Sequence, residues 1–270
     1  MDNQLVILRT VMVLLVLAVI SACAPSSPTQ TATFVPAVPT ATHTAAATAT
    51  TTPTPGPTAT VAQPTATMTP TEVPEESARY LLTFEATWSE ATHPTDFPPN
   101  PHFSGLIGAT HRDAVRLWEE GGAATPGIEN MAETGGKSPL DNEIETLMDA
   151  GGACEMISGG GIALSPGMVT VEFTVNQDCP LVSVVSMIAP SPDWFVGVAG
   201  LSLYGDGRWV EELVVDLYPY DAGTDSGRSY TSPDEPTEVR EGIYRIDASP
   251  LLVEGQVPPL GMFRFTRLRE

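Results

Sequence analysis

Acidic side chains stand among loop-forming residues in two stretches of the sequence. Asp193 lies in the segment APSPDW, and Asp221 and Asp225 begin and end the segment DAGTD. Gly223, between these two, allows the chain to curl so that both carboxylates can face one point. Calcium takes about six to eight hard oxygen ligands, many of them from carboxylates on loops, and tolerates irregular geometry. These residue types at this spacing predict a calcium site.

Two other interpretations of the acidic loops stay open. Asp, Gly, Ser and Pro are turn formers, and an Asp in such a loop often hydrogen-bonds to its own backbone. The loops could also form the active site of a secreted hydrolase that is assisted by a metal ion. Catalysis needs a general base or a nucleophile as well, and the sequence near Asp193 and Asp221 shows no convergent histidine or nucleophile. This favours a binding site over an enzyme.

Three histidines and a tryptophan are further candidates for chemistry. His93, His102 and His111 lie in loop-like stretches, and no two of them have the spacing of a metal site on a helix. Structural hydrogen bonding is therefore favoured over zinc binding. Trp194 could stack on a ligand beside Asp193, but such a residue more often packs in the core.

Alternating or β-branched apolar runs predict the strands that must position these residues. In residues 168–175 (MVTVEFTV), apolar side chains alternate with polar ones, which indicates a strand with one buried face. Similar runs predict strands at residues 80–88, 181–188, 195–204, 209–218 and 261–268. The sequence thus favours an antiparallel sheet structure.

Only two segments have helical patterns. Residues 112–119 and 140–150 are predicted helices, the second with Ser138 or Asp141 as its cap and Gly151 as its stop. We therefore predict an all-β fold, an antiparallel β-sandwich with one or two short helices.

The connections between the strands predict where the acidic residues meet. A turn at residues 176–180 and a hairpin at residues 205–207 join the strands from residue 168 to residue 218 as an up-and-down meander. The loops that contain Asp193 and Asp221 then emerge at the same end of the sheet. Glu172, midway along the first of these strands, is a fourth candidate ligand.

Residues 1–23 predict an export signal. Arg9 is the last residue of a short n-region, the charged start of a signal peptide. The apolar residues 10–20 that follow are too few to span a bilayer comfortably as a permanent helix. The segment ISAC, ending at Cys23, resembles the lipobox of bacterial lipoproteins, which implies cleavage before Cys23 and acylation of its thiol. An ordinary secretory signal is the alternative. The lipobox predicts a cell-surface protein that is held on the membrane by its lipid anchor alone and faces outward.

Residues 24–78 predict a disordered linker. Between Ala24 and Thr71 there is no Asp, Glu, Lys or Arg, and Thr, Pro and Ala dominate. Such a segment has too few large apolar side chains to offset the entropy lost on ordering the backbone. We expect a partly polyproline-II stalk that is open to O-glycosylation.

Residues 79–270 have the length of one domain and carry almost all of the charge. The chain has 12 Lys and Arg against 33 Asp and Glu, a net charge of −21, and Asp2 is the only acidic residue before Glu72. This charge repels phosphate, which excludes nucleic-acid binding, and it attracts divalent cations. Cys154 and Cys179 flank the predicted strand 168–175 and can form a disulfide outside the cell.

Two long motifs resemble a known family. They are SPDWFVGV, at residues 191–198, and DLYPYDAGTDSG, at residues 216–227. Upstream, FEATWS at residues 84–89 and GATH at residues 108–111 follow in the same order. These segments resemble the spondin domain family, of the F-spondin and mindin type, over residues 80–236.

This resemblance implies a C2-like β-sandwich that binds calcium at one end, in extracellular proteins of adhesion and matrix. It implies that Asp193, Asp221 and Asp225 occupy the calcium positions, whereas Glu172 aligns only with a shift. Animal members carry adjoining repeat domains, and here a lipobox and a stalk stand in their place. The expected function is therefore adhesion or recognition without catalysis, and the partner is an unknown extracellular protein or glycan.

Overall fold

The computed structural model describes residues 75–269. The export signal, Cys23 and the Thr/Pro-rich linker up to residue 74 lie outside the described residues. The first strand, β1, begins at Ser77, two residues before the predicted start of the domain. Neither helix within the described residues is long and apolar enough to cross a membrane.

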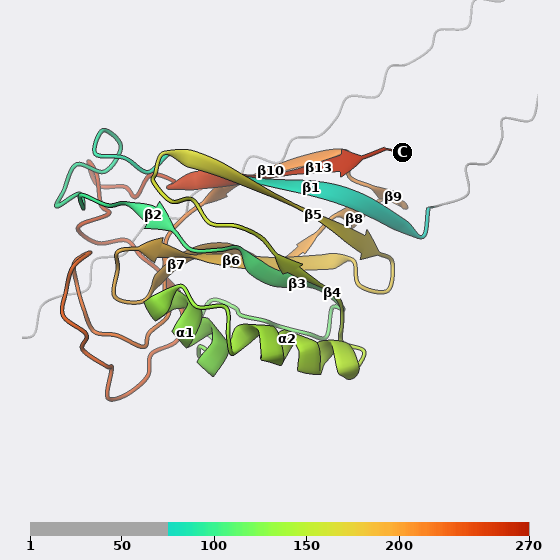
Figure 1. Ribbon diagram of the computed structural model, residues 1–270, viewed down its shortest axis with the longest axis horizontal. Helices are drawn as coiled ribbons and strands as arrows, with labels where there is room; N and C mark the ends of the chain where they lie inside the picture. The colour runs from blue at the N-terminus through green and yellow to red at the C-terminus, as the bar shows by residue number, and fades with distance from the viewer. Residues whose placement is uncertain (1–74, 270) are drawn as a thin grey trace, which may run out of the picture. The chain divides into compact units, whose positions relative to one another are not determined.

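Two antiparallel sheets and a pair of helices form three layers (Figure 1). The first sheet has the order β10-β13-β1-β5 and the second the order β12-β11-β7-β6-β3-β4, with β2 beside β6. The first sheet consists of β1 (Ser77–Ala86), β5 (Gly167–Asn176), β10 (Glu212–Leu217) and β13 (Gly261–Leu268). The second consists of β2 (His102–Phe103), β3 (Ile107–His111), β4 (Ala153–Ser158), β6 (Leu181–Ala189), β7 (Trp194–Ser202), β11 (Tyr220–Asp221) and β12 (Tyr244–Arg245). The predicted all-β sandwich is confirmed.

The burial of each strand follows from its layer. In β5 the side chains alternate between the core and solvent, as its sequence predicts, with Phe173 and Val175 buried. In β6, by contrast, every residue after Leu181 is buried, because the helices cover the face that points away from the first sheet. One apolar core therefore lies between the sheets, and a second lies between the second sheet and the helices.

The helices are α1 (Pro126–Thr134) and α2 (Leu140–Asp149). The predicted helix at residues 140–150 is confirmed, although Pro139 occupies its N-cap and no side chain caps it. The predicted helix at residues 112–119 is wrong, because this segment forms turns. Its backbone bonds elsewhere: the Arg112 N–H donates to the carbonyl oxygen of Gly152, at 2.9 Å. Helix α1 was not predicted.

The predicted meander is wrong, although its strands and its hairpin exist. Only β6 and β7 are neighbours in the second sheet, whereas β5 pairs with β1 and β10 pairs with β13 in the first. The turn after Asn176 thus carries the chain from one sheet to the other. The hairpin at Gly205–Gly207 joins two short strands, β8 (Tyr204–Gly205) and β9 (Arg208–Trp209), which form a ribbon of their own.

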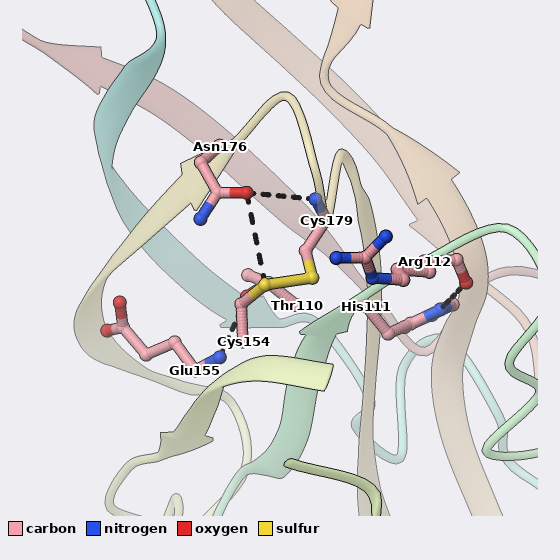
Figure 2. Close-up of a disulfide and its surroundings, with 7 residues drawn as sticks. All are labelled: Thr110, His111, Arg112, Cys154, Glu155, Asn176 and Cys179. Atoms are coloured by element: carbon pink, nitrogen blue, oxygen red, sulfur yellow. Dashed lines mark hydrogen bonds between the residues drawn. A yellow bond between two sulfur atoms is a disulfide. The ribbon is translucent and has the colours of Figure 1, made fainter. Parts of the chain in front are cut away.

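A disulfide links the two sheets. Cys154 on β4 and Cys179, just after β5, are bonded to each other (Figure 2). The Asn176 side chain accepts a hydrogen bond from the Cys179 N–H at 2.9 Å, which closes the turn beside the bridge. The predicted cysteine pair is therefore present in the structure.

The histidines of the domain make structural hydrogen bonds. The His111 Nδ1 atom lies 2.9 Å from the Arg112 carbonyl oxygen, so Nδ1 carries the proton and donates it. The Nε2 atom then accepts a hydrogen bond from the hydroxyl of Ser183, at 2.8 Å. His93 and His102 likewise lie within hydrogen-bond distance of backbone carbonyl oxygens. Both His93 and His111 are fully buried.

Candidate metal centre

Asp193 is held at the end of the sandwich by the loop between β6 and β7. The hydroxyl of Ser191 accepts a hydrogen bond from the Trp194 N–H at 3.1 Å, which tightens this loop immediately before β7 begins. Trp194 is buried and packs against Tyr230, with ring centroids 5.5 Å apart. The core interpretation of Trp194 is therefore confirmed, and Asp193 beside it is fully buried as well.

Strand β11 brings the second acidic segment to Asp193. Tyr220 and Asp221 pair with Phe195 and Trp194 of β7, so the two motifs of the sequence lie side by side. Gly223 follows in the left-handed region, at φ 73°, and an added Cβ there would lie 2.6 Å from the carbonyl oxygen of Glu241. Only glycine fits this position, which explains how the chain turns back over Asp193.

The two oxygens of the Asp193 carboxylate have different surroundings. Oδ2 accepts three hydrogen bonds: from the Thr224 N–H at 2.8 Å, the Thr224 hydroxyl at 3.2 Å and the Asp225 N–H at 3.1 Å. Oδ1 is buried and has no hydrogen-bond partner among residues 75–269. A buried acceptor without a partner is costly, and a bound cation would satisfy it.

Asp193 and Asp221 form a pair of buried acids. Burial, and after it the neighbouring Asp221 charge, raise the pKa of Asp193 to about 6, although the hydrogen bonds from Thr224 and Asp225 lower it. Burial also raises the pKa of Asp221, although one of its oxygens accepts the Gly223 N–H at 2.8 Å. Two desolvated carboxylates that disfavour each other's charge suit a cation between them.

The Asp225 backbone N–H reaches Asp193, but the Asp225 carboxylate shapes its own loop. Its Oδ1 atom accepts the Gly227 N–H at 2.6 Å, and its Oδ2 atom accepts the Glu235 N–H at 2.9 Å. Such hydrogen bonds from nearby backbone N–H groups are those expected of an Asp that only stabilises a turn. Within residues 75–269 the Asp225 carboxylate does not gather with Asp193 and Asp221 into a close group of three acids, and its role as a calcium ligand stays a prediction.

Glu172 lies elsewhere. It is exposed on β5, in the other sheet, where its carboxylate forms an ion pair with Arg79 at 2.7 Å. The expected approach of Glu172 to the acidic loops depended on the meander, and because β5 pairs with β1 this approach does not occur.

The structure adds two residues that the sequence did not indicate. Burial raises the pKa of Glu133, on α1. A hydrogen bond with Thr224 lowers this pKa, whereas the charges of Asp193 and Asp225 raise it. Tyr244 of β12 pairs with Asp221, and burial and the Asp221 charge raise the pKa of its phenol. A helix that carries Glu133 could have been predicted from Thr125-Pro126, because Thr is a common N-cap residue, Pro is common in the first helical turn, and the Thr125 hydroxyl does cap α1.

The donor chemistry of this group suits a hard cation. Within residues 75–269, no group of three or more His, Cys, Asp or Glu side chains is gathered closely enough to form a metal site by itself. Calcium, however, completes its shell with backbone carbonyl oxygens and water. The free Oδ1 atom of Asp193 beside Asp221 therefore fits calcium as a site of two carboxylates with other oxygens.

Comparisons with known proteins place this geometry in a family. The model of the family Spondin_N matches residues 78–252. Spondin-2 of Rattus norvegicus is 35% identical over 208 residues, which cover 72% of this chain and 62% of that protein. Spondin-1 of Gallus gallus is 40% identical over 173 residues, covering 62% of this chain and 22% of that protein. The chain thus spans less than two thirds of the length of these relatives. Because the family model covers both acidic motifs and most of the sandwich, this chain belongs to the Spondin_N family.

Proposed function

We propose that this protein is a cell-surface lipoprotein that presents a calcium-binding Spondin_N domain for adhesion or for recognition of an extracellular protein or glycan. One observation carries the calcium part: the buried Asp193 carboxylate has an oxygen without a partner among the described residues and lies beside a second buried acid, Asp221. The similarity to Spondin-1 and Spondin-2 supports an extracellular recognition role.

The direction of the strands supports presentation of the acidic end. The start of β1 lies beside the end of β13, with Arg79 paired to Leu268, so residue 75 lies at one end of the sandwich. Asp193 follows β6, which runs away from that end, and so it lies at the opposite end (Figure 1). The described chain therefore begins at the end of the domain opposite the candidate metal centre.

Calcium would supply fixed positive charge between two loops that already share hydrogen bonds to the Asp193 carboxylate. Asp193 comes from the loop between β6 and β7, while Asp221 begins the segment that turns at Gly223. With their charges compensated, both loops would stay ordered as one recognition surface. We propose no catalysis and do not advance the hydrolase alternative, because no observation on the described residues favours it.

Calcium titration of the chelator-treated full chain tests the metal. An ion that binds only the folded form stabilises it by about 2.7 kcal/mol at roughly a hundredfold excess over its Kd. We expect the melting temperature to rise with calcium and much less with magnesium, which requires a smaller octahedral shell. Asp193→Asn should weaken calcium binding by about tenfold or more, because it removes one of the two charges that face the ion.

Asp206→Asn is the matched control for this titration. Asp206 lies in the β8–β9 hairpin with φ 52°, a conformation that Asn also tolerates. Its calcium response should equal that of the unaltered chain. No heat of calcium binding by calorimetry, or equal losses in the two variants, would show that the acidic loops are only turns. Probing an array of extracellular proteins and glycans with and without calcium tests recognition itself.

A further inference from the structure

Thr224 contacts the Asp193 carboxylate through two different groups. Its backbone N–H and its hydroxyl both donate to the Oδ2 atom of Asp193, at 2.8 Å and 3.2 Å. Asp193 is fully buried, and Thr224 is 3% exposed. Because hydrogen bonds are stronger away from solvent, these two contacts hold the carboxylate in one orientation.

The hydrogen bonds occupy one carboxylate oxygen and leave the other free. Together with the Asp225 N–H at 3.1 Å, the Oδ2 atom has three donors, which is more than its two lone pairs. The Oδ1 atom has no donor among residues 75–269. A cation that binds Asp193 therefore meets Oδ1, and this acid serves as a ligand through one oxygen.

Thr224 is itself fixed from the other side. Its carbonyl oxygen accepts the Thr237 N–H at 2.9 Å, and the carbonyl oxygen of Gly223 accepts the Glu241 N–H at 3.1 Å. Thr224 thus lies between the segment 237–241 and Asp193. These contacts involve only the protein, so they fix the two donors of Thr224 independently of an ion.

A role of Thr224 in its own turn is the simpler interpretation. A Thr that only stabilises a turn bonds with its hydroxyl to backbone groups close by in the sequence. The Thr224 hydroxyl instead reaches a carboxylate that is 31 residues away in the sequence and belongs to another loop. The contact therefore connects the two loops of the candidate metal centre.

We propose that Thr224 is a positioning residue of the calcium site, which holds Asp193 so that its Oδ1 atom faces the ion. Groups that hydrogen-bond to a metal ligand orient that ligand, and their loss typically lowers metal affinity by about 10-fold to 100-fold. A carboxylate that is fixed in advance loses less freedom when the ion binds. The inference rests on the proposed function, to which it adds a residue that contacts the ligand and not the ion.

Calorimetric titration of the chelator-treated full chain with calcium chloride tests two substitutions of Thr224. Thr224→Val keeps the branched shape and the backbone N–H but removes the hydroxyl, so the calcium Kd should rise by about tenfold. Thr224→Ser keeps the hydroxyl and should recover most of the affinity. Thermal melting of each variant in chelator measures the stability of the fold without calcium. A role confined to the fold would lower this melting temperature and leave the Kd unchanged.

Thr110→Val is the matched control. Thr110 lies on β3 and is fully buried, and its hydroxyl accepts the Glu155 N–H at 3.1 Å. The same substitution there removes a buried hydroxyl far along the chain from both acidic loops. It should lower the melting temperature in chelator but leave the calcium Kd unchanged.

Three results would overturn the proposal: an unchanged Kd in Thr224→Val, an equal rise in Thr110→Val, or no recovery in Thr224→Ser. If the unaltered chain bound no calcium, the proposed metal site would be refuted, and this inference with it. Calcium binding that Asp193→Asn weakens but Thr224→Val does not would refute the inference alone.

Discussion

Three buried side-chain atoms lack a hydrogen-bond partner among residues 75–269: Trp88 Nε1, Asp193 Oδ1 and the Tyr230 hydroxyl. Their side chains are connected, because Tyr230 contacts both Trp88 and Trp194, the residue after Asp193. Native proteins keep few such atoms, because each one loses the hydrogen bond that it makes with water in the unfolded chain and gains none in return. Trp88 and Tyr230 are neighbours whose polar atoms interact with each other, so Asp193 Oδ1 is the atom that a bound cation would satisfy.

His111 shows a different use of a buried polar residue. Burial lowers the pKa of this imidazole, and its hydrogen bond to the Arg112 carbonyl only partly opposes the change. In the unfolded chain histidine has a pKa of about 6.5, so around and below that pH the unfolded state binds more protons than the folded state. The stability that His111 contributes is present above this pH and is lost as the pH falls toward the lowered value.

We predict that His111→Gln makes the free energy of unfolding decrease less between pH 7.5 and pH 5 than it does in the unaltered chain, in which the raised pKa values of Asp193 and Asp221 act in the opposite direction to that of His111. Gln can still accept the Ser183 hydrogen bond but takes up no proton. Urea unfolding at the two pH values measures the difference. His93, whose pKa burial also lowers, contributes to the pH dependence in the same direction as His111. An undiminished fall in His111→Gln, with His93→Gln also without effect, would contradict the assignment.

At the scale of elements, the turn between β5 and β6 is where the two sheets are tied together. The chain leaves the first sheet at Asn176 and enters the second at Leu181, and the Cys154–Cys179 bond fixes that passage to β4. The adjoining edges of the sheets also meet here, because the Glu155 side chain accepts the Thr174 N–H of β5 at 3.0 Å. The side chain of β4 thus covers a backbone group that the edge strand would leave open.

Replacing both Cys154 and Cys179 with Ser should lower the free energy of unfolding by about 3 kcal/mol, because the disulfide closes a loop in the unfolded chain and so reduces the conformational entropy of that state. The two cysteines are 25 residues apart in the sequence. Urea unfolding measures the loss, and mass spectrometry of unreduced peptides checks the pairing. Two free thiols in protein from its native host, or an unchanged stability in the double variant, would be the opposing results.

At the scale of the whole molecule, several arginines gather at the end opposite the candidate metal centre. Arg79, Arg208, Arg267 and Arg269 line a hollow at the end where the described chain begins, together with Glu75, Asp206 and Glu211. The carboxylates of the candidate metal centre lie at the opposite end. With a net charge of −21, the protein as a whole would be repelled by a surface of anionic headgroups.

We predict that Cys23→Ala releases the protein from the membrane or leaves its signal uncleaved, because no other residue in the segment ISAC can be acylated. Cell fractionation with mass spectrometry of the mature N-terminus measures this. Ser21→Ala, which keeps the cysteine, serves as the control and should remain anchored. A Cys23→Ala protein that is still acylated and membrane-bound would refute the lipoprotein proposal.

The sequence by itself determined the fold class, most strands and the family motifs. A strand with one solvent-exposed face, such as β5, can be predicted from the alternation of apolar and polar residues, because successive side chains along a strand point to opposite faces of the sheet. Strand β3 gives no such signal, since all five of its residues are buried. Residues 112–119 have helical spacing, yet Leu117 and Trp118 pack into the second core from an irregular loop, and the Trp118 indole N–H donates to the Val198 carbonyl.

Only the tertiary structure decided which acids meet. The sequence predicted that Asp193, Asp221 and Asp225 converge, with Glu172 as a fourth candidate, and it did so from a meander that does not exist and from the resemblance to the spondin family. Pairing of β11 with β7 brings Asp221 to Asp193, and pairing of β5 with β1 takes Glu172 to the other sheet. Strand neighbours in a sandwich depend on which apolar faces must cover each other across the core, and that long-range choice leaves no trace in local periodicity.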